Sequence, residues 1–190
     1  EGWDIGIEQT LFNGLAIVDL TYFEATLENE IYTTYGPAPD YFSTPANRTT
    51  KSDRSGWEAS FSVHPTDDID ILGSYTNLEA TEVANTELRR PEQQGAIDAS
   101  WRVGGGPLKL NLGVTYNGEM LDTDFATFMP TSIDPYTLVR VGASWQVNDT
   151  IELYGRVENV TDEEYQEVLG FKGAPQAFYL GIRFREEKAR

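Results

Sequence analysis

Apolar and polar side chains alternate with a period of two along most of this chain. Leu110 and Leu112, for example, alternate with Lys109 and Asn111. This period is typical of a β-strand with one apolar and one polar face. It predicts an all-β, antiparallel fold of about nine strands, many of them longer than the usual five or six residues. We expect the strands at residues 3–12, 15–33, 56–64, 69–81, 96–103, 108–120, 136–147, 150–160 and 176–184.

The connections between these predicted strands are alternately short and long. The short ones carry turn-forming residues such as Asn13-Gly14 and Asn148-Asp149, which favour tight hairpins. The long ones exceed the usual loop length, and they span residues 36–53, 82–94, 121–135 and 161–175. This regularity is typical of bacterial outer-membrane barrels, in which tight periplasmic turns alternate with long extracellular loops.

The two faces of the predicted strands differ in a way that fits a membrane. No apolar run approaches the roughly 20 residues of a membrane helix, but alternating barrel strands give only a weak hydropathy signal. We therefore predict an antiparallel transmembrane β-barrel segment, with the apolar face toward lipid and the charged face toward the lumen. The alternative is a soluble β-sandwich, which would hide Leu110, Val141 and Leu153 in a dry centre between two stacked sheets.

Strand parity adds a constraint on closure. With nine antiparallel strands, the first and the last run in the same direction, whereas bacterial single-chain barrels have even strand numbers. Because an unpaired sheet edge is intolerable in lipid, we expect these strands to be part of a larger barrel. Aromatic residues near the turn ends of downward strands are expected to form a periplasmic girdle. They are Phe61, Trp101, Trp145 and Phe184.

Composition excludes several functions. The formal charge of −17 argues against nucleic acid as a partner, because phosphate binding needs a basic surface. The chain has no Cys and one His, so it has no disulfides or thiolate metal site, and a His-rich metal site is not expected. The acidic runs at 122–124 and 162–164 lack the spacing of a calcium loop. We predict no metal and no cofactor.

No catalytic constellation is expected either. Glu152 and Glu158 could suggest a glycosidase pair, but they share a face with Arg156 and fit a ladder of charges better. His64 has no nucleophile pattern near it. The protein is therefore not predicted to be an enzyme.

The segment RVENVTDEEYQEVLGFKGAPQAFYLGIRF, residues 156–184, resembles the C-terminal end of TonB-dependent outer-membrane receptors. In that family an ENL(T/F)D–Y stretch precedes a loop and a final aromatic-rich strand. The segments NTELRRP and NGEMLDTDF agree with the same family. Among its subfamilies the chain looks most similar to the vitamin B12 (cobalamin) receptor-like group, although siderophore receptors share most of these segments.

The resemblance implies a 22-stranded barrel in the outer membrane of a Gram-negative bacterium, enclosing an N-terminal plug domain. Residues 1–190 would supply its C-terminal strands, without the plug and the earlier strands. The implied partners are membrane lipid, the plug, the remaining strands, the energy-coupling protein TonB, and a scarce metal chelate or vitamin as substrate. A passive pore without a plug is the alternative. One departure is that Phe184 is followed by REEKAR, where family members end in an aromatic residue, so we expect an extension or an altered terminus.

Under this reading, the substrate would bind at the extracellular mouth. Aromatic and arginine side chains are favoured contact residues, and the four long loops contain several. The candidates are Tyr41, Phe42, Arg89, Arg90, Phe125, Phe128, Met129, Tyr165 and Phe171.

Overall fold

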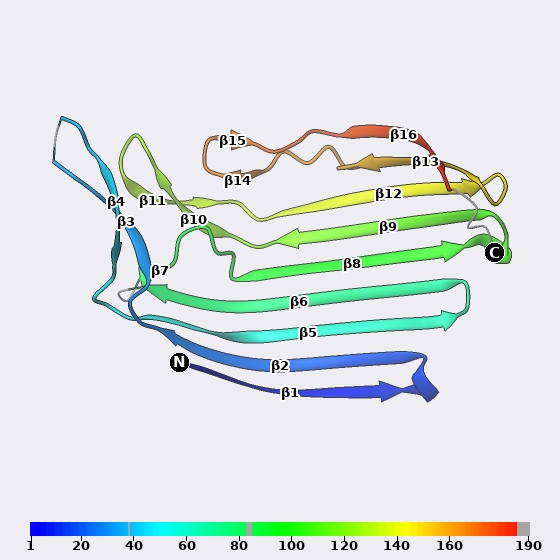
Figure 1. Ribbon diagram of the computed structural model, residues 1–190, viewed down its shortest axis with the longest axis horizontal. Helices are drawn as coiled ribbons and strands as arrows, with labels where there is room; N and C mark the ends of the chain where they lie inside the picture. Colours follow the sequence, from blue (N-terminus) through cyan, green and yellow to red (C-terminus); the bar gives the residue numbers. More distant parts are fainter. Residues whose placement is uncertain (38, 83–84, 186–190) are drawn as a thin grey trace.

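The computed structural model describes residues 1–37, 39–82 and 85–185. Nine strands follow one another in chain order across one antiparallel sheet (Figure 1). They are β1 (Gly2–Leu11), β2 (Ala16–Leu27), β5 (Ser52–Thr66), β6 (Ile69–Glu82), β8 (Gln93–Arg102), β9 (Leu108–Asn117), β12 (Tyr136–Gln146), β13 (Ile151–Glu158) and β16 (Ala177–Phe184). The predicted antiparallel all-β fold is confirmed. The last five residues of the REEKAR segment, 186–190, lie outside the described part of the chain.

Short additional strands lie at one end of this sheet (Figure 1). We call this end the loop end. Each long connection contains some of them, and β7 pairs with the end of β6. They are β3 (Ile31–Tyr35) with β4 (Ser43–Asn47), β7 (Asn85–Thr86), β10 (Met120–Asp124) with β11 (Met129–Ile133), and β14 (Gln166–Val168) with β15 (Phe171–Lys172). The opposite end, the turn end, carries only tight connections. The predicted alternation of short and long connections is therefore confirmed.

Four predicted strand boundaries were wrong by three residues or more. Two strands begin earlier than expected, β5 at Ser52 rather than at 56 and β8 at Gln93 rather than at 96, and two strands end earlier than expected. The strand expected at 15–33 ends at Leu27, because Asn29 adopts a left-handed backbone (φ 57°) and redirects the chain into β3. The strand expected at 108–120 ends at Asn117. The Gly118 amide then turns to donate to the carbonyl of Gln93, and Met120 begins β10. In both strands that end early, the alternation of apolar and polar residues continues past the end of the strand. The residues beyond that end form a separate hairpin in the loop.

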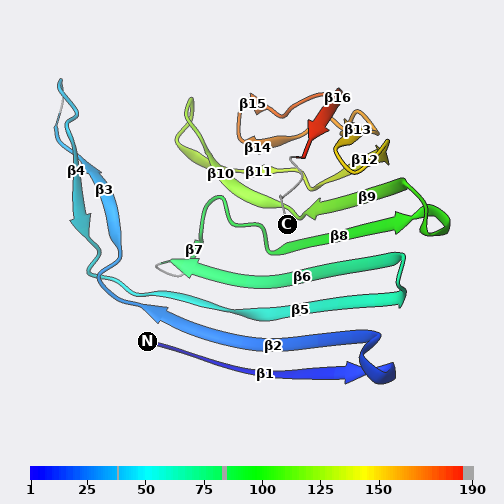
Figure 2. The same ribbon diagram turned by 45° about the vertical axis from the view of Figure 1, so that its right-hand side comes forward.

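The strand register aligns the apolar rows of neighbouring strands on one face. Leu112 in β9 lies opposite Ala99 in β8 and Val141 in β12, whereas Asn111 lies opposite Ser100 and Gly142 on the other face. We call these the apolar face and the polar face. Figure 2 shows β12, β13 and β16 curling away from the plane of the earlier strands, so the sheet is curved like part of a barrel wall.

The apolar face is open rather than buried. Leu110, Val141 and Leu153 are 37%, 38% and 43% exposed, and no second sheet of the described residues stacks on them. The soluble sandwich is therefore excluded as the fold. Within residues 1–37, 39–82 and 85–185 there is also no helix long and apolar enough to cross a membrane.

Both edges of the sheet are open in the described part of the chain. β1 pairs only with β2, and β16 only with β13. At the turn end, successive hairpins are tied together by backbone hydrogen bonds, such as Arg102 N–H to Asp68 O and Gln146 N–H to Pro107 O, at 2.8 and 2.9 Å. The first turn falls at Asn13-Gly14, where the sequence predicts one, but it is a four-residue loop, Phe12–Leu15, rather than a two-residue hairpin turn. Phe12, Asn13 and Gly14 all have left-handed backbone conformations (φ 52°, 56° and 94°).

Candidate functional site: the polar face and the loop end

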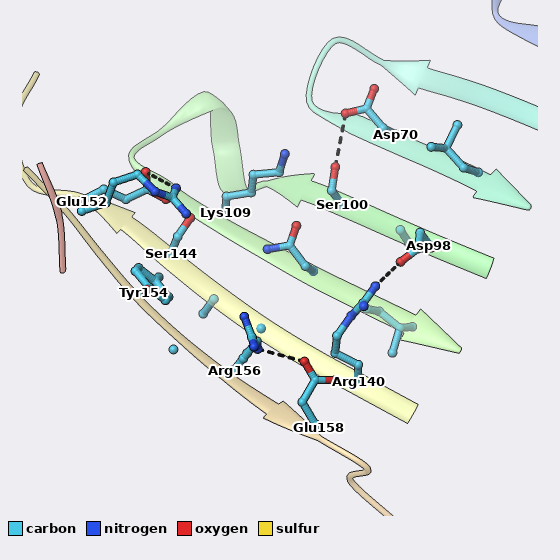
Figure 3. Close-up of a pocket in the computed structure, with 18 residues that line it drawn as sticks. Asp70, Asp98, Ser100, Lys109, Arg140, Ser144, Glu152, Tyr154, Arg156 and Glu158 are labelled. Carbon is cyan, nitrogen blue, oxygen red and sulfur yellow. Dashed lines mark hydrogen bonds and ion pairs between the residues drawn. The ribbon is translucent and has the colours of Figure 1, made fainter. Parts of the chain in front are cut away.

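The polar face contains a hollow of about 600 Å³ that spans β6 to β16 (Figure 3). Charged side chains pair on its surface, one pair spanning the strand between β8 and β12 and another lying within β13. Arg140 Nη2 in β12 donates to Asp98 Oδ1 in β8 at 2.5 Å, and Arg156 pairs with Glu158 within β13 at 2.8 Å. These groups are between one third and about one half exposed, so each pair contributes little to stability. Four acidic and four basic side chains line the hollow, so its surface is charge-balanced.

The two glutamates of β13 each have an arginine partner. Glu152 is nearly buried (7% exposed) and accepts hydrogen bonds from Arg183 and Arg185, both at 2.9 Å. Glu158 pairs with Arg156. The structure thus supports the predicted ladder of charges. Among the described residues there is also no group of three or more His, Cys, Asp or Glu side chains that could hold a metal ion.

A hydrogen-bonded chain near the turn end was not expected from the sequence. Ser62 Oγ lies 2.9 Å from His64 Nε2, and His64 Nδ1 lies 2.7 Å from Asp70 Oδ1. The three residue types are those of a hydrolase triad, but hydrolysis also needs free N–H groups to stabilise an oxyanion. β5 has paired strands on both sides, so its ladder engages the backbone around Ser62. We therefore interpret the hydrogen bonds among Ser62, His64 and Asp70 as structural contacts on the surface of the sheet.

The first two long loops are joined at the loop end through Arg54 in β5. Its Nη2 donates to Glu30 at 2.9 Å and to Glu87 at 3.0 Å. Glu30 lies in the connection from β2 to β5, which is the first loop as the structure bounds it, and Glu87 lies in the connection from β6 to β8, the second loop. Ser52, fully buried, also donates to Glu30 at 2.7 Å. The Ser52 hydroxyl, with Arg54 and Arg48 nearby, holds the pKa of Glu30 below its usual range. Glu87 in turn pairs with Arg90.

The second, third and fourth loops meet at Asp122 in β10, whose side chain is fully buried. Its Oδ1 accepts a hydrogen bond from Arg89 Nε at 2.7 Å and one from the Thr123 amide at 2.8 Å, and its Oδ2 accepts one from the Leu169 amide at 2.9 Å. Burial alone would raise the pKa of Asp122. The hydrogen bonds from Leu169, Arg89 and Thr123 outweigh that effect and lower the pKa below its ordinary value.

The candidate binding residues therefore fall into two groups. Arg89, Arg90 and Tyr165 have partners within the chain: the two arginines form the pairs above, and the Tyr165 ring packs on Tyr136, with 4.6 Å between ring centroids. The others are exposed at the loop end, each by more than 60% of its surface. They are Tyr41, Phe42, Phe125, Phe128, Met129 and Phe171.

The segment that carries the family resemblance organises the fourth loop. Asn159 is buried and has a left-handed backbone (φ 50°). Its side-chain amide donates to the carbonyls of Glu163 and Ala174 at 2.9 and 3.1 Å, and its Oδ1 accepts from the Glu163 amide at 2.8 Å. Asp162 Oδ1 accepts from the Gln176 amide at 2.9 Å. The motif thus has a clear structural role in shaping the loop that leads into β16.

Three of the four predicted girdle residues lie on the apolar face at the turn end. Trp101 and Trp145 are the penultimate residues of β8 and β12, and Phe184 ends β16; all three are exposed. Phe61 lies further inside β5 and is half-buried.

A second aromatic row crosses the first three strands of the sheet. The rings of Trp3, Tyr22 and Trp57 pack there in a tilted arrangement, with centroid distances of 5.4 and 5.0 Å. Sequence reasoning missed this row, because only the register brings the three rings side by side.

A family model described as "TonB dependent receptor-like, beta-barrel" matches residues 1–160. The vitamin B12 transporter BtuB of Vibrio cholerae serotype O1 is 33% identical to this chain over 78 residues, which are 40% of the chain and 13% of that protein. The chain therefore spans a small part of the length of this curated relative.

Solved receptors have the same fold. The Pseudomonas aeruginosa receptor FpvA, bound to a heterologous pyoverdine with iron, superposes with a TM-score of 0.79 at 22% identity, over 96% of this chain and 26% of that one. The ferric-catecholate import receptor Fiu of Escherichia coli K12 gives 0.76 at 20% identity, over 96% and 27%. The structural likeness shows the fold. The family match covers most of the chain, so the chain is part of a Gram-negative outer-membrane protein and belongs to the TonB-dependent receptor-like β-barrel family.

Proposed function

We propose that this chain forms the C-terminal part of the barrel of an outer-membrane receptor that imports a scarce metal chelate or vitamin, of the siderophore or cobalamin class, with energy from TonB. Further strands of the same barrel would cover the open edges of β1 and β16, since lipid does not tolerate unpaired strand edges. The plug domain would occupy the space that the polar face encloses. The exposed aromatic residues of the loop end would make the first contacts with the substrate.

The observation that carries the proposal is the division of the sheet into two faces with all long loops at one end. An apolar face that is open along nine strands fits lipid, and a charged polar face fits an enclosed aqueous interior. The family match adds the receptor class. BtuB is a vitamin B12 transporter and FpvA is a pyoverdine receptor, so both substrate classes remain under this proposal.

Uptake by the intact cell tests the proposal. The gene for the full-length receptor is deleted in its host, and uptake of radiolabelled cobalamin and of radio-iron siderophores is measured with and without a functional TonB. We expect one of these uptake activities to require both the receptor and TonB. Receptor-dependent uptake that persists without TonB would favour a passive pore. Deletion without effect on either substrate class would contradict the proposal.

A further inference from the structure

The four long loops are linked through a continuous set of buried or half-buried contacts at the loop end. We define the loop-end network by its members, which are Glu30, Ser52, Arg54, Glu87, Arg89, Arg90 and Asp122 together with the Leu169 amide. Glu30 lies in the first loop, the Glu87–Arg90 segment in the second, Asp122 in the third and Leu169 in the fourth. These partners are up to 47 residues apart in the chain.

The contacts between the loops are not independent of one another, because one segment of the second loop takes part in several of them. Glu87 is bonded to Arg54 and to Arg90, and Arg89, two residues after Glu87 in the same segment, holds Asp122. The backbone of the same segment is fixed at both ends, since the Glu87 amide donates to the Ala80 carbonyl and the Arg89 amide to the Leu121 carbonyl, at 2.9 and 2.6 Å. If the second loop shifts, Arg54 and Asp122 must therefore move with it. Otherwise the bonds from Glu87 to Arg54 and from Arg89 to Asp122 are broken.

Burial makes such breaks costly. Ser52, Glu87 and Asp122 are at most 6% exposed, and in the described part of the chain no buried side-chain nitrogen or oxygen lacks a hydrogen-bond partner. Removing one partner of a buried charged pair leaves an uncompensated charge, which is strongly unfavourable. The arrangement of lowest free energy keeps all junctions made at once.

We propose that the loop-end network couples the four loops into one unit, so that a change at one loop is transmitted to the others. Asp122 and Arg54 are then positioning residues, which hold the exposed aromatic tips at fixed relative positions. The coupling itself follows from the contacts above, and only its consequence for substrate affinity rests on the proposed function. Coupling between distant loops requires a structural element whose position is influenced by both of them. The shared Glu87–Arg90 segment is that element.

The test perturbs Asp122 and observes the first loop, which Asp122 does not touch. The full-length receptor is reconstituted in liposomes. Because this chain has no cysteine, spin labels can be placed at Asp40→Cys in the first loop and Asp149→Cys at the turn end, after any cysteines elsewhere in the receptor are replaced. We expect Asp122→Asn to broaden the distance distribution between these labels. An unchanged distance distribution between these two labels would overturn the coupling.

Two further variants keep this test decisive. Asp124→Asn is the matched control, since Asp124 lies two residues away in β10 and bonds only within its own turn, to Ala126 and Thr127; we expect no change at the first loop. If Asp122→Asn does not assemble, Arg89→Gln breaks the same pair from its half-exposed side and should broaden the first loop as well. A broadening by Asp124→Asn equal to that by Arg89→Gln would contradict the proposal.

A functional measurement separates this inference from the proposed function. Asp122→Asn should raise the substrate concentration for half-maximal uptake by about two- to thirtyfold, the range produced by perturbing a coupled network, with the maximal rate unchanged. Equal affinity in the variant would refute the positioning role. If the wild-type receptor takes up no chelate or vitamin, the proposed function fails, while the spin-label distances still decide the coupling.

Discussion

The ring of Phe61 in β5 lies directly over Gly73, its cross-strand neighbour in β6. A Cβ atom on Gly73 would come 2.2 Å from Phe61 Cε1. The two residues therefore fit as a pair, with the ring occupying the space that the missing side chain leaves. This contact explains why Phe61 is half-buried, unlike the exposed aromatic residues at the turn end.

Gly73→Ala should destabilise the barrel by about 1–3 kcal/mol, because the added methyl group forces the ring from its position. Urea unfolding of the full-length receptor in vesicles measures this free energy. Gly95→Ala on the same face is the control, since its nearest neighbour atom would be 3.5 Å away. Combined with Phe61→Ala, the Gly73→Ala change should cost much less than it does alone, and strictly additive effects would show that the pair is not coupled.

The assignment of the two faces can be tested by introducing the same residue, arginine, at two adjacent positions that lie on opposite faces. Leu112→Arg places a charge on the apolar face and should cost about 2–4 kcal/mol if that face meets the middle of the bilayer. Asn111→Arg places the same charge on the polar face and should change the free energy of unfolding by less than about 0.5 kcal/mol. Equal costs for the two variants would show that the apolar face does not contact lipid.

Asn159 should stabilise the fourth loop in two separable ways. Asn159→Ala removes three hydrogen bonds and leaves a strained left-handed backbone, at a cost of about 2–4 kcal/mol in local stability. Asn159→Gly loses the same bonds without the strain, and should cost about 1 kcal/mol less. Hydrogen exchange of the Gly173 amide, which donates to the Tyr165 carbonyl, reports the opening of this loop. Identical exchange in both variants would exclude a role for the backbone strain.

The loop-end network should tolerate mild acid. The pKa values of Asp122 and Glu30 are lowered in the folded protein, so their stabilising effect is complete above the ordinary carboxyl range of about 4 and is lost only as the pH falls below it, through the folded values. Spin-label distances across the loops should be constant from pH 7 to about pH 5 and broaden only in stronger acid. Broadening between pH 7 and 6 would show that another titrating group controls the loops.

The sequence alone determined which residues share a face, which connections are turns and which are loops, and to which family the chain belongs. These properties are local: side chains of a strand alternate with a period of two, so Leu110 and Lys109 are separated whatever the strand pairs with, and Asn13-Gly14 forms its turn from its own backbone preferences. The RVENVTDEEY segment is closed within one connection, since Asn159 and Asp162 bond to backbone no more than 15 residues further along, before β16 begins.

Only the tertiary structure decided what the loop residues do. Arg89 and Arg90 look like free binding groups in the sequence, yet they pair with Asp122 and Glu87, and Tyr165 packs on Tyr136. No local pattern encodes the partners of Arg89 and Tyr165, because Asp122 lies in another loop and Tyr136 in β12, and they meet only after the register of the whole sheet has placed these segments side by side. Glu87 and Arg90 are only three residues apart, but Glu87 is also held by Arg54 of β5. The exposed aromatic tips were foreseeable from residue type, whereas the network that holds them depends on distances across the folded chain.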